Sequence, residues 1–213
     1  MNKIFEVALI IIICALLYLF FYYVYKRIYA MKKLSSLKES SGAKITRCRC
    51  LFASYFKLSE KPDVIVEIGN CVYFVRLLNG RGGRRFMHFA SREYFVTYSK
   101  MRLSIGNLTY FRGRRGMSGA PGFITTGAHS VKILPKLDIP DEYIAQREIY
   151  GKILIPVLIL NPAPNEVSYV TENKTSIKVA FTGDEIYGQK IFTVTSFSSY
   201  AERVKRAESI YTN

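Results

Sequence analysis

The sequence predicts a mixed α/β domain, an α+β arrangement around a mixed sheet, behind one N-terminal transmembrane helix. Three observations predict it. Residues 7–25 carry no charge and are almost wholly apolar, two strand-like runs flank Gly69 and Asn70, and a third apolar run covers 153–160. The chain that follows the N-terminal run is long enough for one domain and too short for two.

The N-terminal run has the length of a membrane span. As a helix, residues 7–25 would rise about 28 Å, which matches the hydrocarbon core of a bilayer. Aromatic side chains gather at its C-terminal end, where an interfacial belt is expected. A cleaved signal peptide is the alternative. We disfavour it because the run is long, ends in bulky aromatics, and is preceded by one lysine that Glu6 balances.

The charges around this helix predict its direction. Only Lys3 precedes it, whereas five basic side chains follow closely. These are Lys26, Arg27, Lys32, Lys33 and Lys38. The positive-inside rule then predicts a single-pass protein of the cell membrane with its N-terminus outside. The expected divisions are a short extracytoplasmic N-terminus (1–6), the transmembrane helix (7–25), a basic juxtamembrane helix or linker (26–42) and a cytoplasmic soluble domain (43–213).

Positive charge is concentrated in the first half of the chain. The net charge is +15. Residues 76–116 contain ten basic side chains and the single acid Glu93, whereas residues 117–213 contain equal numbers of each sign. Besides the lipid bilayer itself, such a field favours an anionic partner, either nucleic acid or anionic phospholipid.

Two glycine-rich segments supply the predicted anion-binding residues. These are Arg81, Arg84, Arg85, Arg112, Arg114 and Arg115. Glycines beside them would let backbone amides approach a phosphate. Neither segment is a P-loop, because the chain contains no GxxxxGK[ST] motif. The alternative interpretation is a pair of solvated basic loops that bind nothing.

The clearest local pattern is a β-hairpin around Gly69 and Asn70. If these two residues form the loop, Ile68 lies opposite Cys71 and Asp63 lies opposite Arg76. We therefore expect a cross-strand ion pair between Asp63 and Arg76.

Further elements follow from apolar periodicity and capping residues. We expect helix to continue past the membrane to 40–42, a long loop over 110–127, a helix over 141–150 and a buried strand over 153–160. We expect a last strand over 191–197 and then a terminal helix, which Ser199 and Glu202 would open as a capping box.

The order of these elements, with an acid before the first hairpin strand, resembles the restriction-endonuclease-like core. Within it the chain resembles the nuclease-related domain (NERD) pattern over about 45–205. The resemblance implies an Asp on one strand and a Glu-x-Lys on the next, which hold a divalent metal and position a water. Asp63 matches the first element. Arg76 and Leu78 stand at the positions of the Glu and Lys, so the resemblance implies a degenerate, non-cleaving member.

Two functions from different classes remain. In the preferred one, the domain is a noncatalytic module that binds a polyanion and needs no cofactor or metal. In the other, it is a membrane-tethered, magnesium-dependent nuclease with an atypical site. Its candidate residues are Asp63, Glu67, Asp184 and Glu185. The nuclease needs two or three of these acids within about 4–6 Å of a common point.

Overall fold

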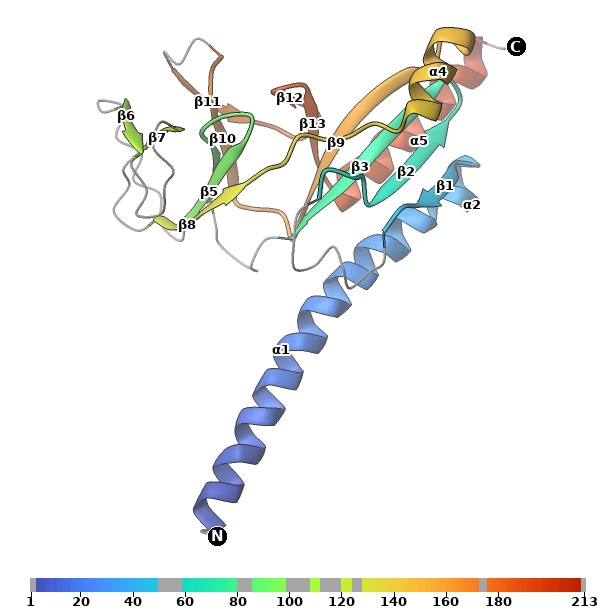
Figure 1. Ribbon diagram of the computed structural model, residues 1–213. Helices are drawn as coiled ribbons and strands as arrows, with labels where there is room; N and C mark the ends of the chain where they lie inside the picture. Colours follow the sequence, from blue (N-terminus) through green and yellow to red (C-terminus); the bar gives the residue numbers. More distant parts are fainter. Residues whose placement is uncertain are drawn as a thin grey trace.

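The computed structural model describes residues 3–49, 59–79, 86–98, 108–111, 120–123, 128–172 and 176–211. One long helix projects from a mixed α/β body (Figure 1). The helices are α1 (Lys3–Ser35), α2 (Leu37–Ser41), α4 (Asp141–Tyr150) and α5 (Val194–Tyr211). The predicted fold class, a mixed α/β domain with mixed sheets behind a long apolar helix, is confirmed.

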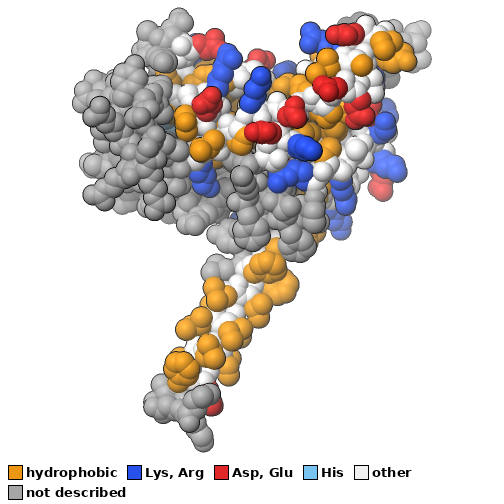
Figure 2. Space-filling model, viewed as in Figure 1, with side chains coloured by type: hydrophobic (Ala, Val, Ile, Leu, Met, Phe, Trp, Pro, Cys, Tyr) orange, Lys and Arg blue, Asp and Glu red, His pale blue; other side chains and the backbone are white. Residues whose placement is uncertain are grey.

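The N-terminal part of α1 stands clear of the body. No Gly or Pro interrupts the helix, and its large apolar side chains face outward along its length (Figure 2). Ile11 and Tyr25, for example, are 63% and 68% exposed. By length and composition, α1 is the one candidate for a membrane span in the described part of the chain.

The C-terminal part of α1 belongs to the body itself. Ala30, Met31 and Leu34 are buried there, as is Leu37 of α2, and all four join a core cluster with residues of the sheet and of α5. Gly42 ends α2 in the left-handed conformation, with φ 63°. Helical structure therefore continues past residue 25 as far as Ser41, and this part of it packs as part of the core.

The main sheet has six strands in the order β1-β2-β3-β9-β13-β12. They are β1 (Lys44–Arg47), β2 (Val64–Ile68), β3 (Cys71–Asn79), β9 (Ile153–Asn161), β12 (Glu185–Ile186) and β13 (Gln189–Thr193). The central strands β3, β9 and β13 are parallel, and the outer pairs are antiparallel. Parallel central strands need cover on both faces, which explains why β3 and β9 are so rich in apolar residues.

The hairpin prediction is confirmed in its register. β2 pairs antiparallel with β3, with Ile68 opposite Cys71 and Val64 opposite Val75. Gly69 takes φ 53° at the turn, a conformation that favours glycine.

A second sheet lies beside the first (Figure 1) and has the order β11-β10-β4-β5-β8. Its strands are β4 (Phe86–Phe89), β5 (Tyr94–Tyr98), β8 (Ala128–Ile133), β10 (Glu166–Val170) and β11 (Ile177–Ala180). Two further strands, β6 (Leu108–Phe111) and β7 (Ala120–Phe123), pair antiparallel with each other. The expected long loop over 110–127 is therefore wrong where the chain is described.

The two faces of the main sheet have different cover. On one face, side chains such as Val66 and Val75 pack against α1, α2 and α5. On the other, Phe74 packs edge-on against Tyr143 of α4, and Leu78 packs among residues of the second sheet. Alternation along β3 sends Arg76 to this second face, between Phe74 and Leu78.

The helix predicted over 141–150 is confirmed as α4. The predicted start of the terminal helix is wrong, because α5 begins at Val194 and not at Ser199. Thr193 and Ser196 form the reciprocal cap instead. The Ser196 amide donates to Thr193 Oγ1 at 3.1 Å, and the Thr193 amide donates to Ser196 Oγ at 2.9 Å. Residues 194–197, expected as strand, are thus helical.

Candidate functional site

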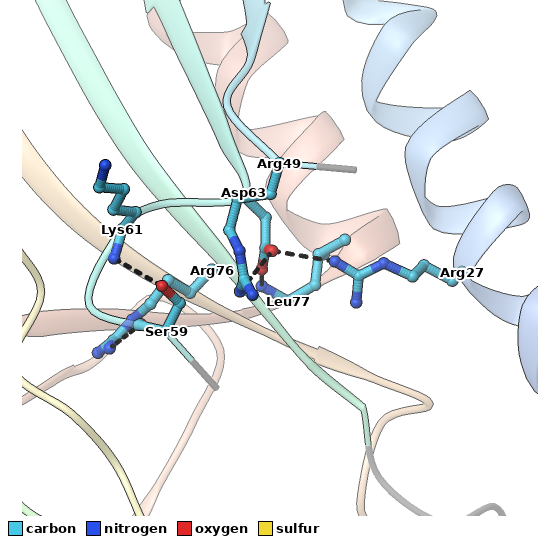
Figure 3. A network of polar contacts seen from close by, with 7 residues as sticks. All are labelled: Arg27, Arg49, Ser59, Lys61, Asp63, Arg76 and Leu77. Atoms are coloured by element: carbon cyan, nitrogen blue, oxygen red, sulfur yellow. Dashed lines mark hydrogen bonds and ion pairs between the residues drawn. The ribbon is translucent and has the colours of Figure 1, made fainter. Parts of the chain in front are cut away.

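A buried carboxylate, Asp63, lies where α1 meets the start of β2. Its Oδ1 accepts a hydrogen bond from Arg27 Nη2 at 3.0 Å, and Arg49 Nη1 lies 3.5 Å from the same oxygen. Its Oδ2 accepts from the Leu77 amide at 2.8 Å. Figure 3 shows the carboxylate among these donors. Both oxygens are occupied, which is the condition under which a buried carboxylate is stable.

The predicted ion pair between Asp63 and Arg76 is not present. The Asp63 amide donates to Val75 O at 2.8 Å, so Asp63 has left the register in which Val64 faces Val75. This shift turns its carboxylate toward α1. Arg76 extends away from α1, toward Ser59 (Figure 3).

Arg76 is among the largest fully buried side chains of the described residues, with 1% of the residue exposed. Its Nη1 donates to the carbonyl oxygens of Ser59 and Pro135, and its Nη2 donates to Gln189 Oε1 at 2.7 Å. Its Nε has no partner. Burial lowers the pKa of Arg76 to about 10, and the field of Asp63 opposes that shift. Among the described residues, no carboxylate contacts this guanidinium.

Glu67, on β2, is held by two lysines. Lys44 Nζ and Lys152 Nζ each lie 3.0 Å from one of its carboxylate oxygens, and the Tyr143 hydroxyl donates to it at 3.5 Å. Burial acts to raise the pKa of Glu67, but the hydrogen bonds from Lys44 and Lys152 outweigh it and lower that pKa. Burial and then Glu67 raise the pKa of Tyr143 to about 12.

Asp184 follows the turn at residues 182–183, and Glu185 is the first residue of β12. Asp184 Oδ2 accepts from the Phe181 amide at 2.8 Å, so Asp184 stabilises its own turn. Glu185 is exposed on β12. Asp63 immediately precedes β2, and Glu67 lies on β2 four residues further along, or roughly 13 Å away at the rise of a strand. Within the described ranges, no three His, Cys, Asp or Glu side chains are grouped to hold a metal ion.

The six predicted anion-binding arginines lie outside the described residues. They are Arg81, Arg84, Arg85, Arg112, Arg114 and Arg115. The described chain before the first three ends at Asn79, which pairs with Asn161 at the ends of β3 and β9. Asn161 Nδ2 in turn donates to Lys26 O at 3.0 Å. The end of β3, at Asn79, therefore lies close to Lys26 of α1.

Lys26, near the end of β3, also contacts an aromatic side chain of α1. Its Nζ lies 4.2 Å from the centre of the Tyr22 ring, a cation–π distance, and Tyr22 stacks on Tyr18. A lysine over a tyrosine at the end of an apolar helix is the arrangement expected at a membrane surface.

The junction of the two sheets contains a cavity of about 460 Å³. Its walls come from the turn between β4 and β5, from residues 133–137 and 139 at and after the end of β8, from Pro156 of β9, and from residues 187–189 at the start of β13. Pro135 and Gln189, the partners of Arg76, are part of that lining. Sequence reasoning missed this site because its walls come from four segments far apart in the chain. The one signal was an arginine within an apolar strand.

The second sheet buries a polar pair. His88 of β4 is fully buried, and its Nδ1 lies 2.9 Å from Ser168 Oγ of β10. Burial lowers the pKa of His88 to about 4, so the ring is neutral at pH 7.

No protein-family model, curated protein or solved structure matches this chain.

Proposed function

We propose that this chain is a single-pass membrane protein whose basic domain binds a polyanion at the surface of the membrane that anchors it. The polyanion that we favour is the anionic lipid of the cytoplasmic leaflet. In this proposal the N-terminus is outside, the domain is cytoplasmic, and the domain holds its ligand without cleaving it.

The observation that carries the proposal is the continuity of α1. The helix runs without a break from its exposed apolar part into the core, where Ala30, Met31 and Leu34 are buried. Arg27, 3% exposed, is bonded to Asp63. Arg27 is two residues past the predicted span, or about 3 Å along the helix axis. A domain attached this closely stays beside the bilayer surface.

That short distance favours anionic lipid over nucleic acid as the polyanion. Surface charges act on lipid headgroups over about 8–10 Å at physiological ionic strength. Lys26, Lys32 and Lys33 lie roughly 1–12 Å along the axis from residue 25, and each lysine near an anionic surface contributes about 1 kcal/mol. The segment with Arg81, Arg84 and Arg85 leaves β3 at the end next to Asn161 and Lys26. Lipid headgroups are available there at all times, whereas a nucleic acid would have to compete with them.

The alternative, a magnesium-dependent nuclease, finds less support. Each candidate acid among the described residues has another role or lies apart. Asp63 is bonded to Arg27, Glu67 is held by two lysines, and Asp184 stabilises a turn. Arg76, on β3, adds positive charge where a cation would have to bind.

The test uses the full chain in lipid nanodiscs. Electron-spin resonance with spin-labelled phosphatidylglycerol and phosphatidylcholine gives the relative association of each lipid with the protein. We expect the anionic lipid to be enriched, and the enrichment to fall steeply as salt rises, because screening weakens exposed charges. Changing Arg81, Arg84, Arg85, Arg112, Arg114 and Arg115 together to serine should remove most of the enrichment.

A matched control removes the same charge elsewhere. It changes six exposed basic residues of the C-terminal half to serine: Lys136, Arg147, Lys178, Arg203, Lys205 and Arg206. This variant should keep the enrichment. Equal loss in both variants, or no enrichment in the parent, contradicts the lipid proposal. Salt-sensitive binding of labelled DNA or RNA in zwitterionic nanodiscs would identify nucleic acid as the polyanion, and magnesium-dependent cleavage abolished by Asp63→Ala would establish the nuclease.

A further inference from the structure

A cavity at the junction of the two sheets lies within the body of the domain, and none of the six arginines of the glycine-rich segments lines it. The cavity at the junction of the two sheets has a volume of about 460 Å³, within the range of small-molecule sites. Most of its wall is apolar, with Leu134, Leu137, Ile139 and Pro156 among the lining residues. Few polar groups on an apolar wall are typical of a site for a small organic ligand.

The guanidinium of Arg76 lies directly behind this wall. It donates to Pro135 O and to Gln189 Oε1, and both residues line the cavity. The bond to Arg76 fixes the carbonyl end of the Gln189 side chain. The amide nitrogen of Gln189 remains as a donor for another acceptor.

This guanidinium lacks an ionic partner in the described part of the chain. Its contacts are two backbone carbonyls and one side-chain amide, and its Nε has no partner. Asp63, the acid whose field acts on it, is already bonded to Arg27 and the Leu77 amide. Buried charges are ordinarily paired, so a buried cation with carbonyl partners alone favours an anion nearby.

The charges at the rim of the cavity balance one another. Arg92 pairs with Glu172 at 2.8 Å, and the other two charged lining residues, Lys136 and Glu93, have opposite signs. All four are exposed, so water screens them. The net positive field inside the cavity therefore comes from Arg76, which acts through a medium of low dielectric constant.

We propose that this cavity binds a small amphiphilic anion, with a carboxylate or phosphate head next to Gln189 and Arg76 and an apolar body against Leu134, Leu137 and Pro156. The head accepts a hydrogen bond from the Gln189 amide nitrogen and supplies the negative charge that Arg76 lacks. The apolar body covers the wall that the two sheets leave open. The site goes beyond the proposed polyanion binding, because it uses none of the six arginines in the glycine-rich segments.

The test places a fluorescent reporter at the mouth of the cavity. The chain contains no tryptophan, and Ile133 lines the cavity but is 57% exposed, so Ile133→Trp adds one reporter without disturbing the core. The probes are 4-phenylbutyrate, 3-phenylpropyl phosphate and the neutral 4-phenylbutanol, added to the full chain in zwitterionic nanodiscs. Either anion should change the tryptophan emission and bind at least about tenfold more tightly than the alcohol, the value of one hydrogen bond to a charged group. The tighter anion identifies the head.

Two controls locate the site. Ile149→Trp places the reporter on α4, where the side chain is 70% exposed and does not line the cavity, and its emission should not respond. In the Ile133→Trp background, Arg76→Met should remove the preference for an anion. If that variant fails to unfold cooperatively, Gln189→Ala replaces it and should weaken anion binding about tenfold with the alcohol unaffected. Equal affinity for the alcohol, a preference that survives both changes, or an equal response from position 149 overturns the proposal.

Discussion

The two faces of the main sheet each bury an arginine, but the two arginines have different partners. On the face covered by α1 and α5, Arg27 forms an ion pair with Asp63 at 3.0 Å. On the face shared by α4 and the second sheet, Arg76 donates to carbonyl oxygens and an amide, and no described acid contacts it. The first face also joins the domain to the apolar helix, whereas the second contains the cavity.

This difference indicates a structural role for the charge of Arg27 and, in our proposal, a binding role for the charge of Arg76. In the Arg27–Asp63 pair, each buried charge has its counter-charge within the protein. Because the pair connects α1 to the start of β2, its role is to hold the helix against the domain. Arg76 has the same burial without the same compensation. Variants at the two positions should therefore differ in the sign and the size of their effects on stability.

The largest effect is expected at Asp63. Asp63→Asn keeps the shape of the side chain but leaves Arg27 buried without a counter-charge, so the free energy of unfolding should fall by about 3–5 kcal/mol. Urea unfolding of the full chain in detergent micelles measures it. Glu67→Gln is the matched control. Its partners Lys44 and Lys152 are 74% and 23% exposed at the side chain, so both lysines stay in contact with water after the change and the loss there should be smaller, about 1 kcal/mol. Similar losses in both variants would mean that the Arg27–Asp63 pair does not connect the helix to the domain.

The second effect tests a buried group on the side of the second sheet. His88 has a native pKa of about 4 against 6.5 for the free side chain. Between these values the unfolded chain binds more protons than the native protein. The contribution of neutral His88 to the free energy of unfolding should therefore be fully present above about pH 6.5. It should be lost, by about 3 kcal/mol, as the pH is lowered to about 4. His88→Gln should remove this part of the slope, measured as the difference between the two unfolding curves. Parallel curves for the two proteins would contradict the burial of a neutral His88.

The third effect is smaller and concerns the contact between α2 and α5. Gly42 and Gly151 both have φ 63°, but a Cβ would lie 2.9 Å from Lys205 Nζ at Gly42 and would meet nothing within 4 Å at Gly151. Each change to alanine should cost about 1 kcal/mol for the left-handed backbone. Gly42→Ala should cost slightly more, because Lys205 must move. Thermal unfolding compares the two, and a larger loss at Gly151 would contradict the packing of α2 on α5.

The smallest effect is expected at Arg76, the counterpart of Asp63. Arg76→Met removes a buried charge that no described acid compensates, so the change in stability should lie within about 1 kcal/mol and can be favourable. The same urea series as for Asp63→Asn measures it. A loss of several kcal/mol would mean that Arg76, like Arg27, is essential to the packing of its face.

The two faces also differ in how much of their structure could be predicted from the sequence alone. The register of β2 on β3 and the bounds of α4 follow from local signals, a two-residue turn and a helical pattern before Gly151, and both were predicted correctly. The partner of Asp63 was not, because Arg27 lies 36 positions away, in the segment assigned to a juxtamembrane helix or linker. The cap of α5 was misplaced by six residues, since Ser199 and Glu202 fit the same spacing as Thr193 and Ser196. The predicted arginine site lies outside the described residues, and the cavity requires knowledge of how the sheets meet.

The proposed function requires α1 to cross a membrane once, with the domain on the cytoplasmic side. The most direct measurement labels single cysteines, introduced as Asn2→Cys and Ser199→Cys into a cysteine-free chain, with a membrane-impermeant maleimide. Ser199 is exposed on α5. We predict that position 2 is labelled in intact cells and that position 199 is labelled only after the membrane is permeabilised. Labelling of position 199 in intact cells, or recovery of the protein in the soluble fraction, would contradict the account.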